Sequence, residues 1–291
     1  MKQEQNINRE LLSPPGDTIQ ETIETINMSQ AELALRMGRP KEKLNQLISG
    51  KEPLTRKTAL QLERVLGIPV NFWINRENAY REELMRIEQD EYLQNLYHWA
   101  LNFPINDLFT HNYLGSVDSK NAITESLLKF FSIATPLQWE LLYNNPELNT
   151  LIGKLINNIN IYSYSAWIRI AEVDTDAMKL PDFDKKAARQ FQNSLKTKRY
   201  SIEEIMSNLS KAGIAVVVTP LIADIQIEYL TRWYHKSPVI QINKPAISTI
   251  SFQNFIQEQL KLILMYPKRH ISAGILSTSQ KPDQVSVTSR G

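Results

Sequence analysis

The sequence predicts a mainly α-helical protein with a small α/β part near its C-terminus. Between residues 17 and 83, apolar residues recur at helical spacing in five short segments separated by Gly or Pro. Residues 84–200 keep this helical periodicity, with breaks at Pro104, Pro136, Pro146 and Pro181. Residues 213–220 (GIAVVVTP) form a continuous β-branched run, which is typical of a buried strand. Further strands are expected around residues 229–234 and 238–243, followed by an amphipathic helix at 251–266.

These patterns predict five consecutive parts. We expect a flexible arm at residues 1–16, a five-helix domain at 17–83, a helical linker or partner region at 84–200, an α/β domain at 201–276 and a disordered, polar tail at 277–291. Phe72 and Trp73 are expected to anchor the core of the five-helix domain, and Leu60 to face inward. Trp139 and Trp167 are expected in the core of the later part.

Composition excludes several classes of site. The chain has 291 residues and no cysteine, which rules out disulfides, thiolate zinc sites and cysteine nucleophiles. Its first residues lack the apolar core of a signal peptide. The longest apolar run is far shorter than the ~20 residues that span a bilayer. We therefore expect a soluble, cytoplasmic protein without a membrane partner.

Residues 28–51 (MSQAELALRMGRPKEKLNQLISGK) carry the signals of a helix-turn-helix. Ser29 is an expected N-cap, with Glu32 completing a capping box. Gly38 fits the left-handed end of the first helix, and Pro40 the start of the second. Gly50 is expected to end the second helix. The pattern predicts a unit that enters a DNA major groove, and the alternative is an ordinary helical hairpin in an all-α core.

Charge distribution supports the DNA-binding interpretation. Residues 29–57 hold seven Lys and Arg against three Glu, a net charge of +4, whereas the whole chain has a net charge of only +2. Positive charge concentrated on one small helical unit is expected where a protein contacts phosphates.

Positions within the motif suggest individual roles. Lys41 and Asn45, one turn apart, are expected to reach guanine and adenine edges. Glu42 either accepts from cytosine or pairs with neighbouring cations. Gln30, Lys51 and Thr55 are expected at phosphates. The predicted DNA-binding set is Gln30, Arg39, Lys41, Glu42, Lys43, Asn45, Gln46, Lys51 and Thr55. For Arg39, Lys41 and Lys43 individually, the alternative is a solvated helix face.

The stretch from Pro14 to Glu83 resembles the XRE family of Cro/repressor-type helix-turn-helix regulators, most closely the HigA antitoxin subgroup. The residues that carry the resemblance are PPGDTIQETI and MSQAELALRMGRPKEKLNQLISGKEPLTRKTALQLERVLGIPVNFWINRENAYRE. It implies a lambda-repressor-like fold, binding to an operator as a homodimer, and repression of the protein's own operon. It also implies a possible toxin partner.

The remainder resembles the ImmA/IrrE-type metallopeptidase-like domain. The residues that carry this resemblance are AWIR at 166–169, the run at 213–220, TRW at 231–233, PVIQI at 238–242 and the helix before PKRH at 267–270. In that family this helix bears His-Glu-x-x-His, whose two His bind Zn²⁺ while the Glu acts as general base.

The zinc motif is broken in this sequence. If Pro267 marks the end of the helix, the motif positions read Glu258, Gln259, Leu260, Lys261 and Leu262. The ligands are lost, the base has become an amide, and the four His have no spacing of four. The family's third, acidic ligand lies further downstream than this sequence extends. We therefore expect a degenerate, truncated domain with no catalytic residue, no metal and no cofactor.

Taken together, the sequence predicts a sequence-specific transcriptional regulator, a repressor of the HigA antitoxin type, that is not an enzyme. Two alternatives remain open at this stage. One is a zinc metallopeptidase that regulates a partner repressor, which the lost zinc motif disfavours. The other is a vestigial protein whose C-terminal part does not fold stably.

Overall fold

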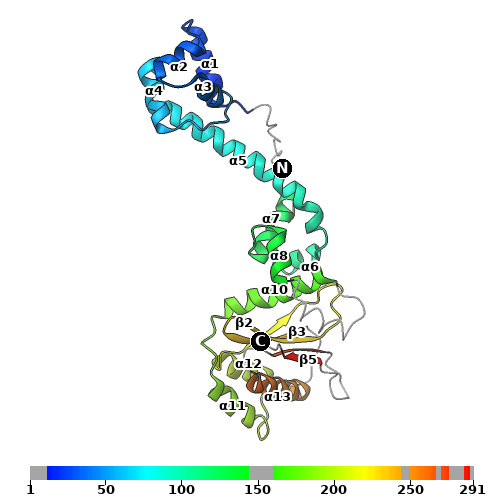
Figure 1. Cartoon of the computed structure of the whole chain (residues 1–291). Coiled ribbons are helices and arrows are strands. Elements are labelled where there is room, and N and C mark those ends of the chain that lie inside the picture. The colour runs from blue at the N-terminus through cyan, green and yellow to red at the C-terminus, as the bar shows by residue number, and fades with distance from the viewer. Residues whose placement is uncertain (1–11, 144–159, 244–248, 267–269, 275–284, 289–291) are drawn as a thin grey trace. The chain divides into compact units, whose positions relative to one another are not determined.

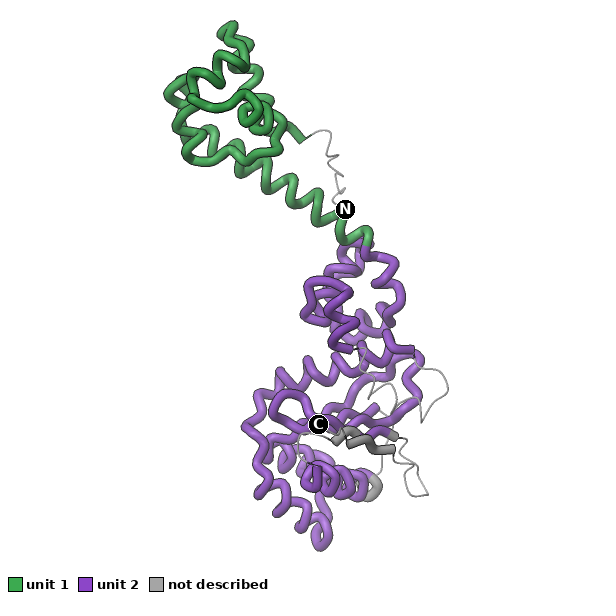
Figure 2. Tube along the Cα trace, viewed as in Figure 1, with its two compact units in different colours: residues 1–95 green, residues 96–291 purple. Residues whose placement is uncertain are grey.

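The computed structural model describes residues 12–143, 160–243, 249–266, 270–274 and 285–288. The protein is mainly helical with one C-terminal sheet, as the sequence predicts (Figure 1). It divides into two compact units, residues 1–95 and 96–291 (Figure 2). The predicted break at Pro146 lies outside the described residues.

Unit 1 contains four short helices and most of a long one. They are α1 (Pro15–Thr25), α2 (Gln30–Met37), α3 (Lys41–Ile48), α4 (Arg56–Leu66) and α5 (Val70–Ala100). The predicted limit at residue 83 falls inside α5, which continues without interruption to Ala100. Helix α1 begins within the predicted arm, because Pro14 is its N-cap and Gly16 already lies in the helix.

One apolar core holds unit 1 together. Trp73 is completely buried at its centre, and its indole N–H donates to the Ile68 carbonyl at 3.2 Å. Around it pack buried side chains from α1 to α4 and the α3–α4 loop: Ile19, Ile23, Leu33, Ala34, Met37, Leu44, Leu47, Leu54, Ala59 and Leu62. Two inward assignments are wrong, since Phe72 and Leu60 are 44% and 41% exposed. Phe72 instead lies edge-on against Trp73.

Unit 2 begins with helices packed around aromatic side chains. These helices are α6 (Ile105–Thr110), α7 (Lys120–Phe131), α8 (Pro136–Tyr143) and α10 (Ile161–Met178). Trp139 and Trp167 are buried in their shared core, as predicted. The indole N–H of Trp167 donates to the hydroxyl of Thr219 at 2.7 Å, which ties α10 to the sheet.

The sheet has the strand order β1-β3-β2-β4-β5, with β1 parallel to β3 and the other pairs antiparallel. Its strands are β1 (Ala215–Thr219), β2 (Tyr229–Tyr234), β3 (Ser237–Asn243), β4 (His270–Gly274) and β5 (Val285–Thr288). Strand β5 lies within the tail that was predicted to be disordered. Its alternating Val-Ser-Val-Thr sequence fits pairing with β4.

Helices cover both faces of this sheet (Figure 1). Val217 and Val239 pack with Ala171 of α10 on one face. Val216 and Ile240 pack on the other face with three further helices, α11 (Lys185–Ser194), α12 (Ile202–Lys211) and α13 (Thr249–Met265). Because side chains alternate between the two faces along a strand, neighbouring residues such as Val216 and Val217 pack against different layers of helices.

Candidate nucleic-acid interface

The turn between α2 and α3 follows the predicted capping chemistry. The Ser29 hydroxyl accepts from the Glu32 backbone N–H at 3.1 Å, and Gly38 adopts the left-handed conformation with φ 63°. Only half of the predicted capping box forms, because the Glu32 carboxylate pairs with Arg36 at 2.6 Å instead. Pro40 is the N-cap of α3 rather than its first residue.

Helix α3 buries one side and exposes the other. Leu44 and Leu47 lie in the core of unit 1. Five predicted DNA-binding residues point outward and are exposed: Lys41, Glu42, Lys43, Asn45 and Gln46. A helix held by its apolar side and presenting cationic and amide side chains has the composition expected of a recognition helix.

Two of the predicted cations are tied to a carboxylate. Arg39 is only 19% exposed and its guanidinium lies 3.5 Å from Glu52. Lys43 lies 4.0 Å from the other Glu52 oxygen and donates to the Gln46 amide oxygen at 3.2 Å. Glu52 therefore neutralises part of the local charge, whereas no ion pair among the described residues involves Lys41 or Lys51.

The other predicted phosphate contacts lie at helix starts. Gln30 is half-buried and its amide donates to Gln20 at 2.7 Å, so that its side chain is oriented by α1. Thr55 is the N-cap of α4, and its hydroxyl accepts from the Thr58 backbone N–H at 3.2 Å. Lys51 is exposed just after α3.

Contacts that the sequence did not reveal hold the C-terminal end of α3. A Cβ on Gly16 would lie 1.7 Å from the Ile48 carbonyl oxygen, so α1 meets α3 backbone to backbone. Arg81 of α5 donates to the Gly50 carbonyl at 3.0 Å and pairs with Glu77 at 2.7 Å. Arg76 donates to Ser13. The sequence carries no local signal for these contacts, because the partners are distant along the chain.

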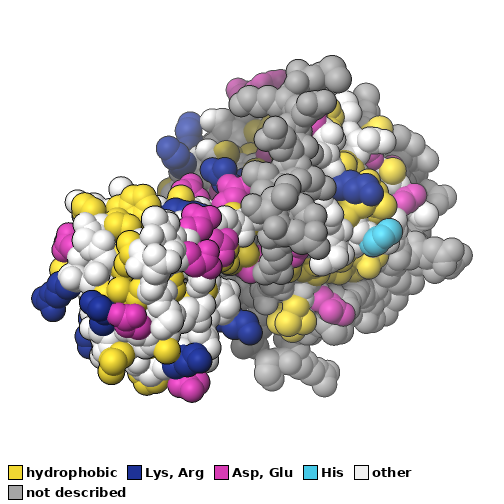
Figure 3. All heavy atoms as spheres, turned by 90° about the horizontal axis from the view of Figure 1, so that it is seen from above, with side chains coloured by type: hydrophobic (Ala, Val, Ile, Leu, Met, Phe, Trp, Pro, Cys, Tyr) yellow, Lys and Arg dark blue, Asp and Glu magenta, His cyan; other side chains and the backbone are white. Residues whose placement is uncertain are grey.

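Positive charge does not form one continuous patch on the face shown in Figure 3. Lys and Arg side chains there are interspersed with Asp, Glu and apolar side chains.

The positions that the sequence resemblance aligns with a zinc motif lie in α13. Gln259, in the place of the base, is completely buried, and its amide oxygen accepts from Ser272 at 2.9 Å. Glu258 and Lys261 are exposed and Leu262 is half-buried. The neighbouring Tyr229 is buried too, which raises its pKa to about 12. Pro267, at which the sequence predicts the end of this helix, lies outside the described residues.

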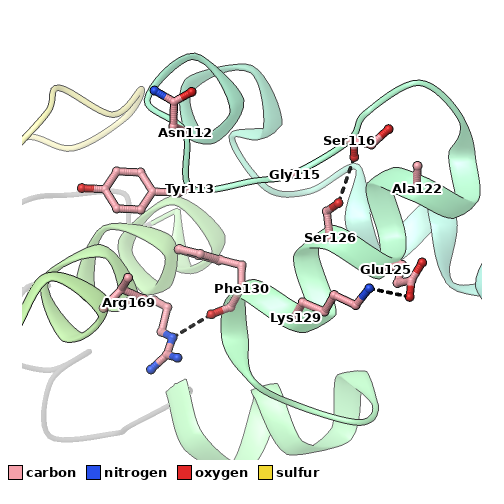
Figure 4. Close-up of a pocket in the computed structure, with 11 residues that line it drawn as sticks. Asn112, Tyr113, Gly115, Ser116, Ala122, Glu125, Ser126, Lys129, Phe130 and Arg169 are labelled. Atoms are coloured by element: carbon pink, nitrogen blue, oxygen red, sulfur yellow. Dashed lines mark hydrogen bonds and ion pairs between the residues drawn. The ribbon is translucent and has the colours of Figure 1, made fainter. Parts of the chain in front are cut away.

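Unit 2 has a pocket of about 500 Å³ between α7, α10 and the loop before α7 (Figure 4). Its charged groups are paired within the chain. Lys129 lies 2.7 Å from Glu125, and Arg169 binds the Phe130 carbonyl and Glu172. In the described part of the chain, no group of three His, Asp or Glu could hold a metal ion.

None of the described helices is long and apolar enough to cross a bilayer.

No protein-family model matches the chain. Over 66 residues it is 36% identical to the uncharacterised HTH-type transcriptional regulator YddM of Escherichia coli (strain K12). This match covers 23% of the present chain and 70% of that protein. The chain therefore belongs to the family of helix-turn-helix-type transcriptional regulators.

Proposed function

We propose that the protein is a sequence-specific DNA-binding repressor that inserts α3 into the major groove of an operator. The observation that carries this proposal is the outward face of α3, where Lys41 and Asn45 are exposed on a helix whose opposite side is buried in the core of unit 1. The similarity to a helix-turn-helix-type regulator supports it. We refer to α3 below as the recognition helix.

Phosphate contacts are assigned to groups around the recognition helix. Lys51 follows its C-terminus and Gln30 starts the preceding helix. The N-terminus of α4 adds backbone N–H groups beside Thr55, and helix N-termini favour anions. These contacts fix the position of the protein on the duplex, and the side chains of the recognition helix select bases.

The HigA antitoxin type is the narrower form of the proposal. It rests on the resemblance of residues 14–83 and includes a homodimer on a palindromic site and a toxin partner. Repression then follows from covering a promoter, so the proposal needs no catalytic residue or cofactor. The zinc peptidase alternative predicts stoichiometric zinc, but Gln259 and Leu262 offer it neither a base nor a ligand.

Asn45→Ala is expected to relax base selection at one operator position. The change removes an amide that can bond adenine in two places, and should cost about 1–3 kcal/mol on the matching sequence. Anisotropy titrations against a set of operator variants measure this. Unchanged base preference would exclude Asn45 as a reading residue.

Lys51→Ala is the matched phosphate variant. It is expected to weaken binding to all duplexes by a similar factor and to reduce the slope of log K against log salt by about 1. Titrations at several salt concentrations test this. A reduction confined to one operator sequence would contradict the assignment.

The whole proposal is tested by titrating the chain with its own upstream DNA and with a scrambled duplex of equal length. Preferential, salt-sensitive binding to the upstream DNA is expected. Equal affinity for the two duplexes would overturn sequence-specific regulation.

A further inference from the structure

Unit 2 carries its own concentration of positive charge, on α11 and on the turn that follows it. Residues 185–199 contain six cations and no carboxylate. All six are exposed, and no ion pair among the described residues involves any of them. We call this set the α11 basic surface: Lys185, Lys186, Arg189, Lys196, Lys198 and Arg199.

Helix α11 orients the first three cations. Its buried side inserts Ala188 and Phe191 into the core below the sheet. The Asp184 carboxylate caps its start, accepting from the backbone N–H groups of Lys186 and Ala187 at 2.8 and 3.0 Å. This acid is therefore engaged with the helix, while Lys185, Lys186 and Arg189 remain directed to solvent.

The turn with the other three cations is held by one buried side chain. Gln253 of α13 is 2% exposed. Its amide nitrogen donates to the carbonyls of Leu195 and Lys198 at 2.9 and 2.8 Å, and its oxygen accepts from the Tyr200 N–H at 3.2 Å. These three bonds fix the backbone that presents Lys196, Lys198 and Arg199, so the cations are placed by the fold.

One of the acids that flank the α11 basic surface in sequence is already hydrogen-bonded within the chain. Glu204 closes a capping box with Ser201 at the start of α12, where its carboxylate accepts from the Ser201 N–H at 2.8 Å. Asp182 and Glu203 are exposed at either end of the segment. They limit the net charge but leave residues 185–199 without a carboxylate.

The chemistry of the surface indicates the kind of partner. Its other exposed residues are uncharged and polar: Gln190, Asn193 and Thr197. It offers no exposed large apolar side chain of the kind that anchors protein interfaces or inserts into membranes. Cations with amide and hydroxyl donors are instead the groups that contact nucleic-acid phosphates.

We propose that the α11 basic surface is a second DNA contact, which binds the phosphate backbone without reading sequence. This inference rests on the proposed function, since it assumes that DNA is already the ligand of the chain. It assigns base selection to unit 1 and part of the affinity to unit 2.

Lysine acetylation followed by mass spectrometry tests both assignments on the full chain at once. Duplexes with the upstream sequence and with a scrambled sequence are added before the reagent. We expect protection of Lys185, Lys186, Lys196 and Lys198 by both duplexes. Three exposed lysines elsewhere in unit 2, Lys120, Lys179 and Lys236, serve as internal controls and should react as in the free protein.

Charge removal gives an independent measure. Replacing Lys196, Lys198 and Arg199 by Gln should make the slope of log K against log salt shallower by about 0.9 for each phosphate that is no longer neutralised, up to about 2.7. The preference for the upstream sequence should persist. The charge-matched control, Lys120→Gln with Lys179→Gln and Lys236→Gln, should leave the slope unchanged.

The outcomes separate the two proposals. If Lys41, Lys43 and Lys51 are protected while the α11 lysines react freely, the second contact is overturned and the regulator function stands. If only the α11 lysines are protected, the phosphate contact stands and recognition by α3 is overturned. Protection by anionic phospholipid vesicles but not by duplex would assign the surface to a membrane and overturn the proposal.

Discussion

Gly16→Ala is expected to lower the free energy of unfolding of unit 1 by about 3 kcal/mol, at the upper end of the usual overpacking cost. The added Cβ would lie 1.7 Å from the Ile48 carbonyl oxygen and 2.4 Å from the Ile48 Cα. Backbone atoms cannot move aside as a flexible side chain does, so α1 must separate from α3. The separation would displace the recognition helix, and operator affinity should fall together with stability.

Gly67→Ala is the matched control. Gly67 has φ 76°, but a Cβ there meets no atom within 4 Å. The control therefore carries only the cost of a left-handed alanine, about 1 kcal/mol. Hydrogen exchange of unit 1 amides in the full chain measures both variants. Equal destabilisation by the two would show that the close approach of α1 to α3 is unimportant.

Glu172→Ala is expected to destabilise unit 2 by about 3–5 kcal/mol, the usual result of breaking a buried ion pair from one side. Glu172 is 8% exposed. One of its oxygens lies 3.0 Å from Arg232, and the other lies 3.1 Å from Arg169. The Tyr143 hydroxyl donates to it at 2.9 Å. Removing the carboxylate would leave two largely buried guanidinium groups without a counter-charge.

This cluster joins α8, α10 and β2, so its removal should affect unit 2 as a whole. Burial, together with the charge of Glu172, raises the pKa of Tyr143, which keeps that hydroxyl protonated as a donor. Asp176→Ala is the matched control, because Asp176 is an exposed carboxylate of the same helix that also accepts from a tyrosine, Tyr234. It should cost less than about 1 kcal/mol.

Unit 2 amide exchange in the full chain is the appropriate measurement, since two units need not unfold as one transition. Exchange should accelerate across α8, α10 and β2 in Glu172→Ala and remain near that of the unmodified protein in Asp176→Ala. Similar exchange in both variants would contradict the role of the buried carboxylate.

Local chemistry made much of unit 1 predictable from sequence. Ser29 caps α2 and Gly38 ends it in the left-handed conformation, as expected. Thr55 and Gly67 play the same two parts in α4. Such signals act within a few residues and need no knowledge of the fold. The outward side of α3 follows from the same logic, because Leu44 and Leu47 fix its buried side.

Contacts between distant segments account for most of what sequence reasoning missed. The pairing of Arg39 with Glu52, thirteen residues later, was not apparent from the sequence. Gly16 was placed in a flexible arm, because its neighbour Ile48 is not apparent in the sequence. Strand β5 was missed because its short, polar pattern becomes a strand only by pairing with β4.

The bond from Arg81 to the Gly50 carbonyl has an implication for control of the regulator. It connects α5 with the exit of the recognition helix, so a molecule that engages Arg81 is expected to alter operator affinity without approaching a nucleotide. Thermodynamic reciprocity then requires operator occupancy to change the affinity for that molecule by the same factor.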